Sequence, residues 1–148
     1  MDFITALAKV AQNFDSFFVV VNRLTKVAHL IPTHTTTLMS DIAQLFVKEI
    51  VKLHGVPTMI ISDRDAKFTS KFWMAMFQSL GTLLNLNLAY HPEIDGQNER
   101  VNQVIEDMLR SYCSQQPHLW LKFLPLVEFA YNSLPHRSLG MSPFKTLY

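Results

Sequence analysis

Phe17-Phe18-Val19-Val20-Val21 is the stretch that decides the fold, because a run of aromatic and β-branched residues is typical of a buried strand. Residues 22–26 have the composition of a connection, and 27–31 form a second short run of the same kind, so the two runs predict a hairpin. Pro32 and the threonines that follow it are expected to break the pattern. Upstream, 3–7 favour a first strand, although a helix is not excluded over so few residues.

Helix-like and strand-like segments alternate beyond this hairpin. Apolar residues recur at helical spacing over 40–55, with Ser40 as a suitable N-cap, and again over 70–81; each segment ends in a glycine. Between and after them, 58–61 and 83–89 predict strands, the second through its alternation of leucine with asparagine. Early strands followed by alternating helices and strands predict an α/β fold with helices packed on a sheet.

The last third of the chain is helical after a predicted loop. Residues 90–97 include a proline and a glycine and are expected to form that loop. Apolar residues then repeat at helical spacing over 101–112, which places Glu99 in the first turn of the helix. A last helical region opens at Pro117, and Pro125 should either kink it or mark its true beginning.

Composition excludes several classes of protein. A length of 148 residues suits one domain, and 49% apolar with 17% charged residues argues against disorder. No apolar run approaches the roughly 20 residues that span a bilayer, and the first residues lack the pattern of a signal peptide. Cys113 is the single cysteine and has no internal disulfide partner. The net charge of +1 does not by itself indicate nucleic acid, although it is compatible with a local basic face.

Three carboxylates occupy informative places in this predicted arrangement. Asp2 immediately precedes or enters the first strand, Asp63 follows the strand at 58–61, and Glu99 lies in the first turn of a helix. Functional groups in α/β folds lie at such positions. Carboxylates without cysteine or paired histidine suit Mg²⁺ or Mn²⁺, and two such ions can promote phosphoryl transfer. Each residue also has a structural interpretation, as a terminal residue, a turn residue and a helix-dipole partner. The pattern alone leaves both interpretations open.

Short motifs in a specific order extend along the whole chain. They are MDFIT (1–5), VVVNRLTK (19–26), LHGVP (53–57), ISDRD (61–65), FTSKFW (68–73), AYHP (89–92), DGQNERVN (95–102), EFAYN (128–132) and GMSPF (140–144). In order and spacing they resemble the integrase catalytic core of long-terminal-repeat retrotransposons of the Ty3/gypsy type.

This resemblance implies a fold and a site. The implied fold is ribonuclease-H-like, a five-stranded mixed sheet flanked by helices on both faces, as one domain over 1–148 whose first strand we expect to be truncated at the N-terminus. The family's triad of two aspartates and one glutamate has 35 residues between the second and third members. Asp63 and Glu99 enclose 35 residues here, 64 to 98. The resemblance therefore implies that Asp2, Asp63 and Glu99 are catalytic and bind two Mg²⁺ or Mn²⁺ ions.

The implied activity is metal-dependent processing of DNA 3′ ends and their transfer to target DNA. Water attacks phosphorus in the first reaction and a DNA 3′-hydroxyl attacks it in the second, without a covalent protein–DNA intermediate. The resemblance places the following residues near DNA: Arg64, Lys67, Tyr90, His91, Gln97, Asn102 and Gln103. For each of them, loop packing or ordinary solvent exposure is the structural alternative. DNA ends and target DNA are the expected partners, in the nucleus, with a homodimer or higher homo-oligomer and no membrane.

Departures from the family pattern keep other functions open. Asn22, Glu93 and Ile94 differ from the residues usual in the family. With the near-neutral charge they are compatible with a catalytically inactive, integrase-derived module that binds nucleic acid or assists assembly. A ribonuclease H or related nuclease is a third interpretation, which cleavage of RNA–DNA hybrid without strand joining would favour.

Histidine, cysteine and tryptophan residues are interpreted mainly as structural. His29 and His34 fit ordinary strand and loop positions, and with Cys113 they do not make a ligand set, so we expect no structural zinc. Trp73 and Trp120 are predicted to lie in the core rather than on an oligomer interface.

Overall fold

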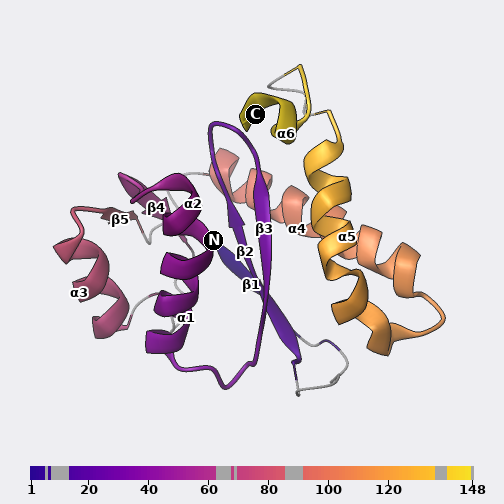
Figure 1. Ribbon diagram of the computed structural model, residues 1–148, viewed down its shortest axis with the longest axis horizontal. Coiled ribbons are helices and arrows are strands. Elements are labelled where there is room, and N and C mark those ends of the chain that lie inside the picture. Colours follow the sequence, from indigo (N-terminus) through magenta and orange to yellow (C-terminus); the bar gives the residue numbers. More distant parts are fainter. Residues whose placement is uncertain are drawn as a thin grey trace. The chain divides into compact units, whose positions relative to one another are not determined.

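Five strands form two separate sheets in the described part of the chain. The computed structural model describes residues 1–5, 7, 14–62, 68, 70–85, 92–135 and 140–147, with side chains for all except 85, 92–99 and 146–147. One sheet has three strands in the order β1-β2-β3 and the other pairs β4 with β5 (Figure 1). The α/β class is confirmed, whereas one five-stranded mixed sheet stays a prediction.

The chain divides into two compact units. One consists of Met1–Asp2 with Thr36–Asn98, and the other of Phe3–Thr35 with Glu99–Tyr148. None of the helices in the described part is long and apolar enough to cross a membrane.

The predicted hairpin is present in the second unit. Strand β2 (Ser16–Val21) pairs antiparallel with β3 (Ala28–Thr33), with Val21 opposite Ala28 and Ser16 opposite Thr33. Strand β1 (Asp2–Ile4) is the other neighbour of β2, which confirms a strand at the N-terminus.

Pro32 does not end β3, so the prediction of a break there was wrong. The strand runs on to Thr33, and Pro32 lies opposite Phe17 in the register. Proline lacks an N–H and is tolerated where no ladder hydrogen bond is required, as on an edge strand. β3 lies at the edge of its sheet, and the sequence around the proline does not reveal this.

The helices of the second unit come from the C-terminal part of the chain. They are α4 (Pro92–Cys113), a 3₁₀ turn (Pro117–Leu119), α5 (Trp120–Ser133) and α6 (Pro143–Leu147). Ile105, Leu109 and Cys113 of α4 lie in the same buried cluster as the aromatic rings of Phe17 and Trp120, whose centroids are 6.1 Å apart. Trp120 is thus a core residue, as predicted.

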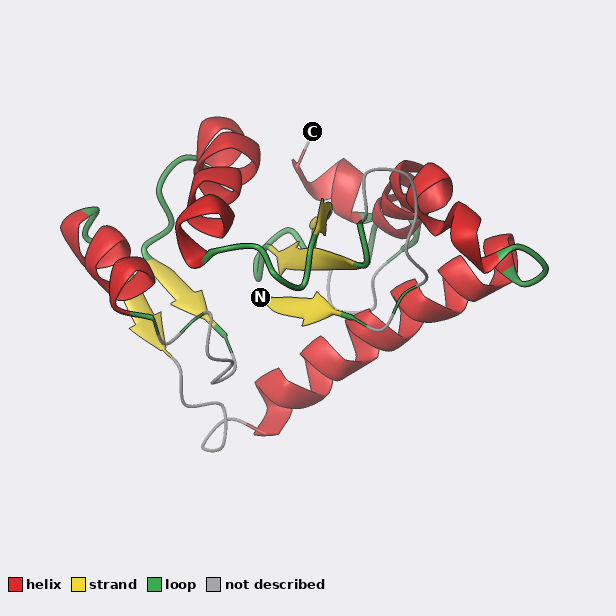
Figure 2. Cartoon of the chain, turned by 90° about the horizontal axis from the view of Figure 1, so that it is seen from below, coloured by secondary structure: helices red, strands yellow, loops and turns green. Residues whose placement is uncertain are grey.

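Three expectations about these helices need correction. Residues 92–97 are helical rather than a loop, and Figure 2 shows α4 as one continuous helix. Proline suits the first helical position because its missing N–H would have no intrahelical partner there. Glu99 is therefore the eighth residue of α4 and not in its first turn, where a helix dipole acts most strongly. Helix α5 begins at Trp120, upstream of Pro125, so that proline is not its beginning.

The first unit is built on a parallel pair of strands. Its elements are α1 (Met39–Phe46), a π-helical turn (Val47–Val51), α2 (Lys52–His54), β4 (Met59–Ile61), α3 (Lys71–Ser79) and β5 (Leu83–Asn85). β4 and β5 run parallel, which requires a crossover connection, and α3 lies in that connection. The first helix is capped by Leu38, which has no side-chain hydrogen bond, and not by Ser40 as predicted.

An aromatic cluster forms the core of this unit. The ring centroid of Trp73 lies 4.4 Å from that of Phe77, 5.6 Å from Phe68 and 5.9 Å from Phe46. Trp73 is fully buried, which confirms the prediction that it is a core residue. Ser70 Oγ accepts a hydrogen bond from Trp73 N (3.3 Å), so the N-cap of α3 also fixes the backbone beside this cluster.

Candidate functional site

Asp2 lies on β1, close in space to the end of β4. The backbone nitrogen of Met1 donates a hydrogen bond to Ile61 O (2.9 Å), and the Asp2 side chain is half-buried. Ile61 is the last residue of β4, two positions before Asp63. The start of β1 therefore lies beside the strand that leads to the second predicted aspartate.

The remaining predicted ligands and most of the predicted DNA contacts are not tested by the structure. Those that fall outside the described residues are Asp63, Arg64, Lys67, Tyr90 and His91. Gln97 and Glu99 belong to α4, but their side chains are outside the described set. Among the side chains that are described, no three acidic, histidine or cysteine residues gather around a common point.

Two predicted DNA contacts on α4 are described. Asn102 is half-buried. Gln103 is exposed, and its Nε2 donates to Asp107 Oδ1 (2.9 Å), which also accepts from Arg110 Nη1 (3.3 Å). Gln103 thus belongs to a polar network on the helix surface, and its contact with DNA stays a prediction.

Cys113, His34 and His29, three side chains that could offer sulfur or nitrogen to a metal, have other contacts. Cys113 is buried in the core of the second unit, and burial raises the pKa of its thiol. The His34 ring stacks on Phe14 with centroids 4.6 Å apart, and His29 Nδ1 lies 3.6 Å from Glu128 Oε1. The predicted set Asp2, Asp63 and Glu99 offers only carboxylate oxygens, a donor chemistry that fits Mg²⁺ or Mn²⁺.

The motif at 128–132 has a structural role that the sequence reasoning missed. Asn132 of α5 is buried; its Oδ1 accepts from Ala28 N (2.8 Å) and its Nδ2 donates to Ala28 O (2.9 Å). Glu128, one helical turn earlier, accepts from Leu30 N through Oε2 (3.0 Å). Two side chains of α5 therefore form hydrogen bonds with backbone groups on the outer edge of β3. Unpaired backbone groups on an edge strand could otherwise pair with a strand of another chain.

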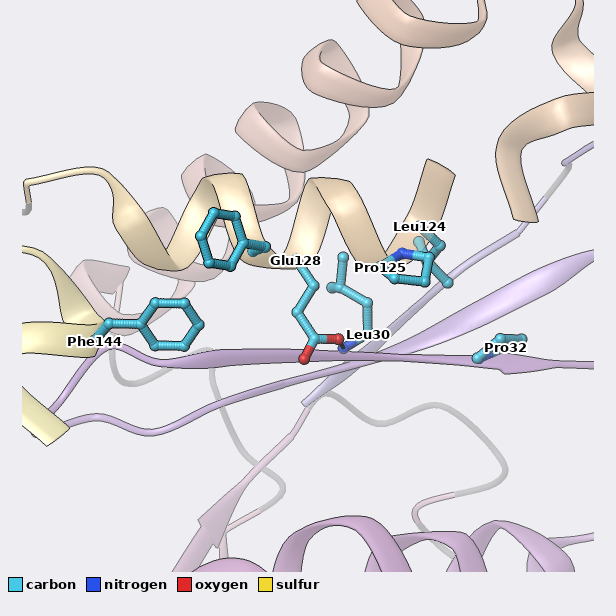
Figure 3. Close-up of a pocket in the computed structure, with 7 residues that line it drawn as sticks. Leu30, Pro32, Leu124, Pro125, Glu128 and Phe144 are labelled. Carbon is cyan, nitrogen blue, oxygen red and sulfur yellow. Dashed lines mark hydrogen bonds between the residues drawn. The ribbon is translucent and has the colours of Figure 1, made fainter. Parts of the chain in front are cut away.

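The same two elements line a pocket with α6. It encloses about 300 Å³ and is bounded by Leu30, Pro32, Leu124, Pro125, Glu128, Phe129 and Phe144. Figure 3 shows the Glu128 carboxylate reaching from α5 toward β3 near Leu30. The pocket is apolar apart from this carboxylate, which is already engaged with backbone and His29.

The geometry described so far is that of an α/β core shared with viral integrases. The fold matches the integrase catalytic core domain of HTLV-2, solved with magnesium in a trimeric form, with a TM-score of 0.76 over 99% of this chain and 93% of that chain at 17% identity. The same domain is also solved in a dimeric form. An intasome of simian T-cell lymphotropic virus, in complex with a PP2A regulatory subunit, matches with a TM-score of 0.78, covering 98% of this chain and 51% of that one at 18% identity.

Similarity in sequence extends from end to end. The Transposon Tf2-3 polyprotein of Schizosaccharomyces pombe is 36% identical over all 148 residues. The chain spans only 11% of the length of that polyprotein. No family model matches the chain. The chain is thus similar over its whole length to a segment of this transposon polyprotein and shares its fold with integrase catalytic cores, which confirms the resemblance seen in the motifs.

Proposed function

We propose that this chain is the catalytic core of a retrotransposon integrase that processes DNA 3′ ends and joins them to target DNA. The observation that carries the proposal is the 36% identity to a transposon polyprotein over the full 148 residues. The spacing of 35 residues between Asp63 and Glu99 supports it, as does the hydrogen bond that draws the start of β1 to the end of β4. One five-stranded mixed sheet is part of the same proposal.

Asp2, Asp63 and Glu99 are the proposed ligands of two Mg²⁺ or Mn²⁺ ions. The magnesium in the HTLV-2 core supports this choice of cation. Bound ions would activate water or a DNA 3′-hydroxyl and stabilise the departing oxygen. The chain's own part is to present these carboxylates and to position DNA. For the second task we propose Arg64, Lys67, Tyr90, His91, Gln97, Asn102 and Gln103.

Association of several copies on DNA belongs to the same proposal. The dimeric and trimeric forms of the HTLV-2 core and the simian virus intasome support it. We further propose that the protein acts in the nucleus, where chromosomal target DNA is found.

A DNA end-processing and strand-transfer assay tests the proposal. The parent chain, Asp63→Asn and Glu99→Gln are incubated with labelled duplex DNA in Mg²⁺ and in Mn²⁺. Both variants should lose at least about a hundredfold in rate, because each removes a carboxylate that would hold a metal ion required for the reaction. Calorimetric titration with Mn²⁺ should show weaker binding by both.

Matched controls separate a site effect from the loss of any acid. Asp41→Asn changes an exposed acid of α1, and Glu106→Gln repeats the glutamate substitution on α4 itself. Both controls should retain nearly parental rates. Equal losses in controls and site variants, or metal binding unaffected by Asp63→Asn, would refute the carboxylate site. Cleavage of RNA–DNA hybrid without strand transfer would instead favour a ribonuclease.

A further inference from the structure

The turn that joins β2 to β3 belongs to a motif that the proposed carboxylate site does not use. Residues 22–26 close the hairpin (Figure 1). Asn22 Oδ1 accepts hydrogen bonds from Leu24 N (2.9 Å) and Thr25 N (3.0 Å). Asn22 N donates to Val27 O (2.9 Å), and Lys26 N donates to Asn22 O (2.8 Å). The turn is therefore a fixed structure, held by the side chain of Asn22, one of the residues that depart from the family pattern.

This fixed turn places two cations together. Arg23 is exposed, and Lys26 is half-buried with a positive φ of 63°. Glycine or asparagine is the usual residue in that conformation, so a lysine there is a local outlier of the kind found at binding sites. Burial lowers the pKa of Lys26, and the nearby positive charge of Arg23 lowers it further. Within the described part of the chain, neither cation forms an ion pair.

An apolar residue, Leu24, lies between these two cations in the sequence of the turn. Leu24 is 82% exposed, the highest value among the large hydrophobic residues described. A single exposed leucine is ordinary, but here the backbone that carries it is held by Asn22 Oδ1. Nucleic acid offers a complementary surface, because phosphates attract paired cations while sugars and base edges accept apolar contacts.

We propose that this hairpin tip, residues 22–26, is a second nucleic-acid contact, in which Arg23 and Lys26 bind backbone phosphates and Leu24 packs against the adjoining sugar. The inference rests on the proposed function only for its choice of partner. It requires no metal, because both cations act as charges on phosphate oxygens. It assigns the hairpin a role in holding DNA, apart from the reacting phosphorus.

Fluorescence anisotropy with labelled duplex DNA in EDTA tests the tip separately from catalysis. The double variant Arg23→Gln/Lys26→Gln should bind about tenfold more weakly at about 50 mM salt. The slope of log affinity against log salt should fall by about 2, since each lost phosphate contact removes about 0.9. Leu24→Ser should weaken binding a few-fold while leaving the slope unchanged.

The control is a second double variant with the same loss of charge. Lys122→Gln/Lys145→Gln removes two exposed lysines from α5 and α6 of the same unit. It should leave the slope near the parental value. The proposal would be overturned if the slope fell equally in both double variants or stayed unchanged in the tip variant. Absence of DNA binding by the parent chain would also overturn it. Asp63→Asn should bind DNA normally in EDTA while losing strand transfer, so failure of the site and failure of the tip give different results.

Discussion

Asn132→Ala should strongly destabilise the unit that contains the hairpin. The substitution removes both hydrogen bonds to Ala28, of 2.8 and 2.9 Å, and Ala28 is fully buried. Its N–H and C=O would then lack partners, at a cost of about 1–3 kcal/mol for each buried group. The expected loss is therefore about 2–6 kcal/mol, a large part of the stability of a small domain.

Urea unfolding followed by circular dichroism measures the loss, and amide hydrogen exchange at Ala28 locates it. Glu128→Gln provides the graded comparison, because the new amide oxygen can still accept from Leu30 N at a half-buried position; it should cost less than about 1 kcal/mol. Ser133→Ala, an exposed change on the same helix, should be nearly neutral. The reasoning fails if Asn132→Ala costs under about 0.5 kcal/mol, or if Ala28 exchange does not accelerate.

Three further changes test other parts of the fold. Gly55→Ala should cost about 1–3 kcal/mol by urea unfolding, because Gly55 has φ 79° and ψ 179°, a conformation essentially confined to glycine. Ser70→Ala should cost about 1 kcal/mol in the same assay by removing the cap on Trp73 N, and restoration by Ser70→Asp would confirm the cause. Burial raises the pKa of Tyr131 in the folded state, so its contribution to stability is complete below the ordinary tyrosine pKa of about 10 and lost as pH rises above it. Tyr131→Phe should therefore flatten the fall in stability above about pH 10, and an unchanged profile would contradict this cause.

Local patterns predicted most of the elements. The strand at Phe17–Val21 and the helix within 70–81 depend on neighbours in sequence, and the structure confirms both. The predictions at Pro32 and Pro92 were wrong because the effect of proline depends on its position. Proline disrupts the interior of a helix or sheet, but it is tolerated on an edge strand and in a first helical turn. Whether a strand lies at an edge depends on strands distant in sequence, which a local window cannot contain.

The candidate site was predictable to a different degree. Spacing and family resemblance named Asp2, Asp63 and Glu99, while the structure describes only the first of these side chains. The hydrogen bonds that Glu128 and Asn132 form with β3 were missed although their motif was noticed. Their partners, Leu30 and Ala28, lie 98 and 104 residues away in the sequence. Polar residues one helical turn apart on an otherwise buried helix face were the available signal.

The spacing of these polar residues follows from the similar rise of one helical turn and of two strand residues. Four helical residues rise about 6.0 Å and two strand residues about 6.6 Å, so positions 132, 128 and 124 of α5 can face 28, 30 and 32 of β3. The alternate residues of β3 point the other way, since Val27 O and Thr33 O accept from the β2 side of the hairpin. The first two outward N–H groups meet Asn132 and Glu128. At the third position the strand has Pro32, which offers no N–H, and the helix has Leu124, with which it lines the pocket. Pro32 and Leu124 therefore form an apolar third step after the two hydrogen-bonded steps at Ala28 and Leu30. The proline that was expected to end the strand leaves no unpaired N–H at this position of the edge.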